Sequence, residues 1–266
     1  MQKIKRFFVL LLIVFGTICF VQAAGGYLAE SLRSLDMDKD MQIDEKVVRQ
    51  MVLRLEPREY YTVQIGSYTD PVGGQNTVDQ LAQAGYRVFV TDGPPYQLWI
   101  GCTGQAPSID ALPQEIRMAG TDIFVQKQVL NRVQYRFPAD ASGEYQDAAV
   151  LLASLDVVLK HSLQLFQDYQ YEACSEENWN RMIAQIQNEL QQIQTSSTAF
   201  LHQTEDEQMV GDMLNLLAAM DSYRESLQLI VDKKSTRMVL LAQSCLLELI
   251  AYYHSLIEQN SISSAA

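Results

Sequence analysis

The sequence predicts an α+β protein, in which a small four-stranded antiparallel sheet is followed by an all-α antiparallel helical bundle. Two observations predict this architecture. Between residues 59 and 130, runs that alternate polar and apolar residues are separated by short helical runs. From Ala139 onward the chain contains no proline, and its apolar residues recur at helical spacing.

The predicted elements of segment 59–130 follow the order β-α-β-β-α-β. The strands are expected at the runs YYTVQIG, YRVFVTD, YQLWIG and TDIFVQKQ, and the helices at GQNTVDQLAQAG and SIDALPQEIRMAG. Gly85 ends the first helix, and Pro113 falls in the first turn of the second. In the split βαβ arrangement, called ferredoxin-like, this order gives an antiparallel sheet with both helices on one face and an open opposite face.

The C-terminal part, residues 144–260, is predicted to be a helical bundle that follows a linker over 131–143. Its helices are expected over 144–172, 176–203, 205–232 and 235–259. The breaks between them are short, so consecutive helices should be antiparallel neighbours. In that arrangement Cys174 and Cys245 lie roughly 15 Å apart, at about 1.5 Å of rise per residue, which is too far for a disulfide.

Residues 1–26 have the pattern of an export signal or a transmembrane anchor. A basic start, MQKIKR, precedes an uncharged run from Phe7 to Val21. The small residues at Val21 and Ala23 fit a signal-peptidase site, whereas the apolar stretch from Phe7 to Ala24 also reaches the lower limit for spanning a bilayer. The prediction is a single-pass membrane protein with the bulk of the chain outside the cytoplasm. The alternative is secretion after signal cleavage.

Residues 27–58 are predicted to be a charged connector without a metal site. Four aspartates of this segment have the spacing of calcium ligands in an EF-hand loop: Asp36, Asp38, Asp40 and Asp44. Met41 and Val47, however, stand where that loop needs a glycine and a bidentate glutamate. The segment is therefore interpreted as a solvated acidic turn between two short helices.

The charge of the chain excludes nucleic acid as a partner. The formal net charge is −12, and segment 59–130 carries three basic residues against seven acidic ones. Contacts of Lys and Arg with phosphates supply most of the affinity for nucleic acid, so an acidic sheet is a poor site for it.

Residues for catalysis are scarce, so the protein is predicted to be a non-enzyme without a cofactor. The histidines His161, His202 and His254 fall on three different predicted helices, with no nucleophile or carboxylate motif around them. The glycine-containing run DPVGGQN lacks the Lys-Ser/Thr ending of a phosphate-binding loop. The histidines are interpreted as surface or boundary residues.

One face of the predicted sheet is the candidate binding site. Alternation along the strands puts aliphatic residues such as Val63 and Ile65 beneath the two helices. The opposite face mixes amides, a guanidinium and large aromatics: Gln64, Arg87, Phe89, Gln97, Trp99 and Phe124. Ser67 extends this face at the end of the first strand. Flat rings with amide donors and acceptors suit a sugar or a stacked base. The alternative is that the linker or the bundle covers Trp99 and Phe124.

The ordered set YYTVQIGSY, AGYRVFV, YQLWIG and TDIFV resembles a SPOR (sporulation-related repeat) domain, over about a quarter of the chain. The resemblance implies a domain that binds peptidoglycan glycan strands on its open sheet face, with a preference for strands stripped of stem peptides, as at division septa. It also implies that Gln64, Ser67, Gln97 and Trp99 belong to the binding surface. The chain departs from the family pattern in the run GCTGQAP after the third strand, and in Gln97, where an arginine is frequent.

The expected function is non-catalytic binding of peptidoglycan glycan strands by a membrane-tethered protein at the division or sporulation septum, with a protein partner for the helical bundle. The alternative is an exported interaction or scaffold module whose SPOR-like sheet docks a protein. A wall hydrolase that uses the SPOR-like domain for targeting is disfavoured, because the sequence shows no catalytic constellation.

Overall fold

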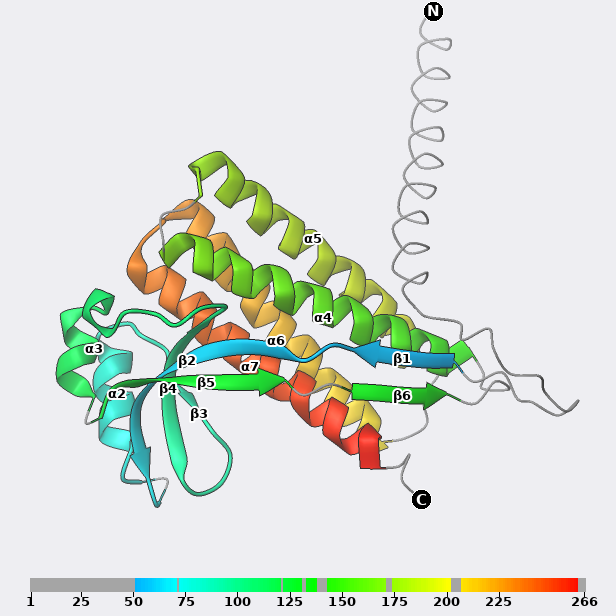
Figure 1. Ribbon diagram of the computed structural model, residues 1–266, viewed down its shortest axis with the longest axis horizontal. Helices are drawn as coiled ribbons and strands as arrows, with labels where there is room; N and C mark the ends of the chain where they lie inside the picture. The colour runs from blue at the N-terminus through cyan, green and yellow to red at the C-terminus, as the bar shows by residue number, and fades with distance from the viewer. Residues whose placement is uncertain are drawn as a thin grey trace, which may run out of the picture.

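The structure, a computed structural model, describes residues 51–70, 72–120, 122–130, 133–137, 143–170, 174–201 and 207–262. These residues form a mixed protein with a four-stranded antiparallel sheet, a two-stranded extension and a set of long helices (Figure 1). The predictions for the N-terminal segment 1–26, for the acidic turn and for His202 lie outside the described residues.

The four-stranded sheet has the strand order β3-β4-β2-β5. Its strands are β2 (Arg58–Tyr68), β3 (Phe89–Val90), β4 (Tyr96–Thr103) and β5 (Phe124–Leu130), all paired antiparallel. The four strands fall where the alternating runs predict them, although β3 keeps only two residues of its run.

Two short helices cover one face of this sheet. They are α2 (Gln75–Gln83), between β2 and β3, and α3 (Gln114–Ala119), which follows a 3₁₀ turn, η1 (Ile109–Ala111), between β4 and β5. Ile65 and Ile100 are fully buried against Leu81 of α2 and Ile116 of α3. The aliphatic face therefore packs beneath the helices, as the alternation predicts, because successive side chains of a strand point to opposite faces.

A pair of further strands extends the sheet. Strands β1 (Met51–Leu55) and β6 (Val133–Phe137) pair antiparallel and continue β2 and β5 across the bundle (Figure 1). They lie in the segments expected to be connector and linker, so the sequence analysis missed them. Five-residue strands that pair only with each other are specified by a contact between segments about 80 residues apart, which local patterning does not reveal.

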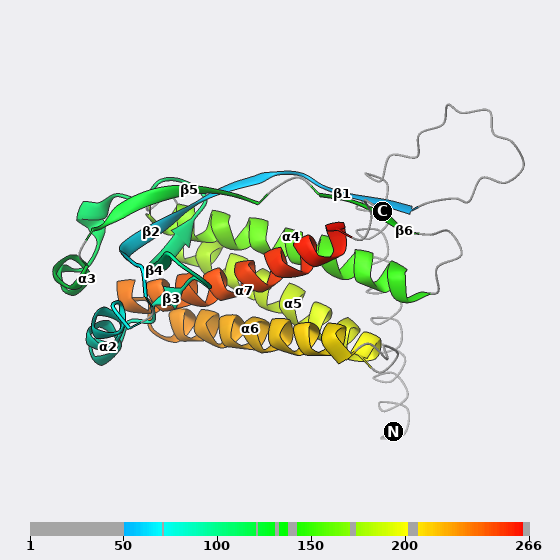
Figure 2. The ribbon, with the colours of Figure 1, turned by 90° about the horizontal axis from the view of Figure 1, so that it is seen from below.

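The bundle consists of α4 (Gly143–Gln170), α5 (Glu176–Leu201), α6 (Glu207–Asp232) and α7 (Thr236–Ile262). The colour gradient runs in opposite directions along successive helices, so neighbours are antiparallel as predicted (Figure 2). Phe166, Trp179, Tyr223 and Tyr253 are almost fully buried between them. The backbone N–H of Asn178 donates to Ser175 Oγ at 3.3 Å, which caps α5.

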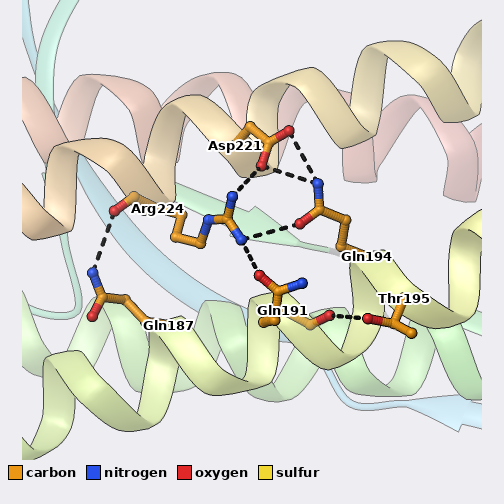
Figure 3. A network of polar contacts seen from close by, with 6 residues as sticks. All are labelled: Gln187, Gln191, Gln194, Thr195, Asp221 and Arg224. Carbon is orange, nitrogen blue, oxygen red and sulfur yellow. Dashed lines mark hydrogen bonds and ion pairs between the residues drawn. The ribbon is translucent and has the colours of Figure 1, made fainter.

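A polar network joins the two helices that lie farther from the sheet, α5 and α6 (Figure 3). The guanidinium of Arg224 contacts Asp221 Oδ1 at 2.9 Å and Gln194 Oε1 at 3.1 Å, and it also contacts Gln191. The amide of Gln194 in turn donates to both carboxylate oxygens of Asp221 at 3.1 Å. These groups fix the register of the helix pair, while their partial exposure keeps each contribution to stability small.

Helix α7 is the most apolar of the long helices. Within the described residues it is the one helix long and apolar enough to cross a membrane, over Thr236–Ile257, and 56% of its apolar window is buried inside the protein. Its neighbours α6, α4 and β4 supply that cover. The thiols of Cys102, Cys174 and Cys245 are unbridged.

Candidate functional site

Strand register brings four of the predicted site residues into one row across the sheet. Phe89 of β3 lies opposite Trp99 of β4, Trp99 lies opposite Gln64 of β2, and Gln64 lies opposite Phe124 of β5. A bulge in the β2–β4 pairing on either side of Gln64 sets this alignment. The ring centroids of Phe89 and Trp99 are 5.8 Å apart. The four side chains therefore belong to one face of the sheet.

This face is covered by the bundle, and the expectation of an open face is wrong. Phe89 and Trp99 pack against the core of the bundle, and Gln64 is only 1% exposed. Helices α7 and α4 both contact β4, and the sheet lies across them (Figure 2). Large aromatics on a sheet face present apolar area, and the apolar stripes of α4 and α7 remove that area from water. Phe124, on the edge strand, remains 39% exposed.

Arg87, another predicted site residue, is held by the bundle. Its Nη1 donates to Ser222 Oγ at 2.9 Å and lies 3.3 Å from Cys245 Sγ. Its Nη2 forms an ion pair with Glu248 Oε2 of α7 at 2.5 Å. The guanidinium therefore ties the residues just before β3 to α6 and α7 rather than facing an external ligand.

Ser67 and Gln97 are the predicted site residues at the far end of the β2–β4 pair. They lie opposite each other, Ser67 exposed and Gln97 half-buried. The backbone N–H of Gln97 donates to Thr91 Oγ1 at 2.9 Å. Together with Phe124, the exposed end of the row, they are the predicted site residues that no helix of the bundle is shown to cover, and we call these three the rim.

The bundle approaches the backbone of the sheet closely at Arg87 and along the segment Ile100–Gly104. Ser244 Oγ of α7 lies 2.8 Å from the carbonyl oxygen of Arg87 and 3.1 Å from that of Ile100. A Cβ on Gly101 would overlap Gln243 Oε1, and the N–H of Gly104 donates to the carbonyl of Leu163 in α4 at 3.3 Å. The GCTG run, which departs from the SPOR pattern, is thus the surface on which α7 and α4 rest.

The sheet–bundle interface also contains polar atoms without a partner. Thr62 Oγ1, Gln64 Oε1 and Trp99 Nε1 are buried and have no hydrogen bond to any described residue. A buried polar group of this kind costs about 1–3 kcal/mol when it stays unpaired. The apolar contacts of Phe89, Trp99 and their neighbours must therefore hold the interface against this cost.

The buried thiol and phenol of this interface are neutral. Burial raises the pKa of the Cys102 thiol far above its ordinary value, and the pKa of Tyr60 is raised by burial and by the nearby Cys102. A thiol that stays protonated is a poor nucleophile and a poor metal ligand. Cys102 therefore acts as a small core residue beneath α7.

A cleft of about 410 Å³ opens at the C-terminal end of β4, near Cys102 and Thr103, where the sheet meets the bundle. We call it the junction cleft. It is lined by the loop after β4, the last turn of α4, the start of α5 and the start of α7, with these residues among others: Thr103, Ser108, Asp168, Tyr169, Trp179 and Lys234. Its lining mixes aromatic, hydroxyl and charged side chains, which is typical of a small-molecule site.

Lys234 is the cation of the junction cleft. Its ammonium lies 5.0 Å from the centre of the Trp179 ring and 5.7 Å from that of Tyr169, and the two rings are 5.3 Å apart. The sequence analysis missed these three residues, because they come from separate segments of the bundle. The one signal for them was the basic cluster Lys233, Lys234 and Arg237 in an acidic chain.

His161 has contacts that are typical of a structural residue. His161 Nδ1 of α4 lies 3.1 Å from both carboxylate oxygens of Glu189 in α5, and 3.3 Å from Gln185 Nε2. It sits at the boundary between the two helices, half-buried. Across the described ranges, no group of three or more His, Cys, Asp or Glu side chains is arranged to hold a metal ion.

Comparison with known proteins gives no relative for this chain: no family model, curated protein or solved structure matches it.

Proposed function

We propose that this is a non-catalytic, exported and membrane-tethered interaction protein, in which a SPOR-like sheet is a docking platform for helices. The observation that carries the proposal is that α7 occupies the polar and aromatic face of the sheet. Phe89 and Trp99 pack on the bundle core, Arg87 pairs with Glu248, and Ser244 meets two strand carbonyls. The face thus recognises a helix through specific contacts.

The strand order supports the SPOR-like, ferredoxin-like assignment. The order β3-β4-β2-β5, with α2 and α3 as the two crossovers on one face, is the order that the split βαβ arrangement requires. The N-terminal apolar segment supports export and tethering.

Binding of peptidoglycan glycan strands, at a division or sporulation septum, is the second candidate function. One observation favours it: Ser67, Gln97 and Phe124 form an accessible rim, and beside this rim Gln64 Oε1 and Trp99 Nε1 lack a protein partner among the described residues. Hydroxyl groups of a glycan are suited to pair with such atoms. Gln64 and Trp99 can bind a glycan only if α7 leaves the sheet.

A binding experiment on purified sacculi distinguishes the two functions. The full chain is kept in detergent micelles, and the fraction retained on the sacculi is measured. Sacculi are used with and without amidase pretreatment, which strips stem peptides from the glycan. The variant Glu248→Arg weakens the contact of α7 with Arg87 and leaves every sheet residue intact. Acrylamide quenching of tryptophan fluorescence reports in parallel whether Trp99 becomes accessible.

The docking proposal predicts low quenching and no amidase-dependent retention for the wild type or for Glu248→Arg. Amidase-dependent retention of the wild type that is lost in Ser67→Glu would establish glycan binding at the rim. Retention that appears only in Glu248→Arg, with increased quenching, would establish glycan binding on the covered face. Either of these two results would overturn the docking proposal.

A further inference from the structure

The junction cleft has the size and position of a ligand site that is separate from the sheet face. Its volume of about 410 Å³ falls within the range of about 300–1,000 Å³ that small-molecule sites occupy. It lies between the sheet and the bundle, and both contribute to its lining. Sites at such junctions are common because two packed units leave a concave seam.

The charge at the mouth of the cleft is opposite to that of the chain. The formal net charge is −12, yet Lys233, Lys234 and Arg237 stand within five residues at the turn between α6 and α7, and all three are exposed. None of the three forms an ion pair with a carboxylate of the described ranges. An anion that approaches the cleft therefore meets three cationic side chains that have no ion-pair partner among the described residues.

Lys234 is held in position without being neutralised. The faces of Trp179 and Tyr169 attract its ammonium at 5.0 and 5.7 Å, and a ring quadrupole orients a cation but leaves its charge available. The carboxylate among the lining residues, Asp168, accepts a hydrogen bond from Gln164 Nε2 at 2.6 Å and forms no ion pair with Lys234 in the described part of the chain. The ammonium of Lys234 is thus available to an incoming anion.

Hydroxyl groups complete the cleft. Thr103, Ser108 and Thr236 line it, and none of their hydroxyls donates to or accepts from another described residue. Thr103 is 3% exposed, and its Oγ1 is a buried atom without a partner in the described part of the chain. A buried hydroxyl in a cleft wall is a group that a polar ligand can satisfy.

We propose that the junction cleft binds a small carboxylate-bearing ligand, with the carboxylate at Lys234 and a hydroxyl- or amide-bearing body against Ser108, Thr103 and Tyr169. Two sources in a cell wall share this chemistry, a sugar acid and the C-terminus of a short peptide. The site does not depend on the sheet face. The wall setting, which rests on the second candidate function, guides only the choice of probes.

Titration of the full chain in detergent micelles with three probes tests the proposal. N-acetylmuramic acid and N-acetylglucosamine share a ring and an acetamide and differ in the lactyl carboxylate, and D-alanyl-D-alanine supplies a peptide carboxylate. Binding is followed by tryptophan fluorescence, since Trp179 lines the cleft and the chain has only one other tryptophan, and by saturation-transfer NMR. A carboxylate probe is expected to bind with a Kd of about 1 mM or tighter, and N-acetylglucosamine to bind at least about tenfold more weakly.

Two lysines of one turn provide matched variants. Lys234→Met keeps the aliphatic stem over the rings and removes the charge, so the carboxylate probe should bind about tenfold more weakly. Lys233→Met removes the same charge from a residue that does not line the cleft, and should change binding less than about twofold. Ser108→Trp, at an exposed lining position, should block the cleft without disturbing the core.

The outcomes are distinct from those of the sacculus experiment. Binding of only one carboxylate probe identifies the source, sugar acid or peptide, and supports the proposal. Three results would overturn it: no saturable binding of either carboxylate probe, equal binding of N-acetylglucosamine, or equal losses in Lys233→Met and Lys234→Met. Because the variants lie outside the sheet, none of these results changes what the sacculi report about the covered face.

Discussion

The hydroxyl of Ser244, in the last helix, lies 2.8 Å from the backbone carbonyl oxygen of Arg87, at the edge of the sheet. The two residues are 157 positions apart in the sequence. Their contact lies where α7 meets β3 and β4, and it is one of the contacts that pack the sheet and the bundle together. Four predictions concern the free energy of unfolding, which is measured by urea titration of the full chain in detergent micelles.

The Ser244 contact should contribute measurably to stability. Ser244→Ala removes the hydroxyl from a site that is 1% exposed and leaves the carbonyl of Arg87 without this donor, so the free energy of unfolding should fall by about 1 kcal/mol. Ser226→Ala is the matched control, because Ser226 is also buried but bonds the carbonyl of Tyr223 within its own helix. A loss in Ser226→Ala as large as that in Ser244→Ala would contradict the assignment of the effect to the interface.

The ion pair between Arg87 and Glu248 should give a small, salt-sensitive contribution. The two side chains are 40% and 28% exposed, so Glu248→Arg should lower the free energy of unfolding by about 1 kcal/mol or less. The loss should shrink in about 1 M NaCl, because a screening length of about 3 Å weakens the repulsion between the two guanidinium groups. Glu225→Arg, at an exposed position of α6, makes the same charge change and should have little effect. A loss in Glu248→Arg that is independent of salt would indicate a packing defect instead.

Two glycines should respond to alanine in opposite directions. A Cβ on Gly101 would overlap Gln243 Oε1 and meet Leu240 Cδ2 at 3.4 Å, so Gly101→Ala should destabilise the protein by about 1 kcal/mol. Adding Gln243→Ala should recover part of this loss. Gly211, inside α6, has open space where the methyl group of an alanine would lie, so Gly211→Ala should raise the free energy of unfolding by about 0.5–1 kcal/mol through helix propensity. Destabilisation by Gly211→Ala would mean that this face of α6 is occupied.

Alkaline pH should destabilise the protein through Cys102. In the unfolded chain a cysteine titrates near about pH 8.5, and burial raises the pKa of the Cys102 thiol in the folded protein. The unfolded state therefore loses this proton at a lower pH than the folded state does. The contribution of Cys102 to the free energy of unfolding is full below about pH 8 and falls as the pH rises, by up to about 1.4 kcal/mol per pH unit. Urea titrations at pH 7, 8, 9 and 9.5 under reducing conditions measure the slope.

The control for the pH prediction removes the buried thiol. Cys102→Ala should flatten the slope between pH 8.5 and 9.5. Above about pH 10 the buried Tyr60 and Tyr223, whose pKa values are raised by burial, steepen the slope in every variant. An identical slope in Cys102→Ala and the wild type near pH 9 would show that this thiol does not carry the effect.

The sequence by itself determined the local elements of this protein. Alternation of polar and apolar residues placed β2, β4 and β5, and the same alternation put Ile65 and Ile100 beneath α2 and α3. Helical spacing of apolar residues, with a Ser175 cap, placed the four long helices to within a few residues. Each of these features depends on neighbours within a few positions, so the sequence alone is enough to predict it.

Only the tertiary structure decided what the second face of the sheet does. Alternation shows that Gln64 and Trp99 share a face, but it carries no information on whether another part of the chain covers that face. The cover over Trp99 depends on α7, which begins about 140 residues further along the chain and contacts β4, and on Gly101, which lets the helix approach. The strands β1 and β6 and the junction cleft likewise come from segments far apart in sequence. Contacts of this kind arise from the packing of whole elements, which the local pattern of residues does not encode.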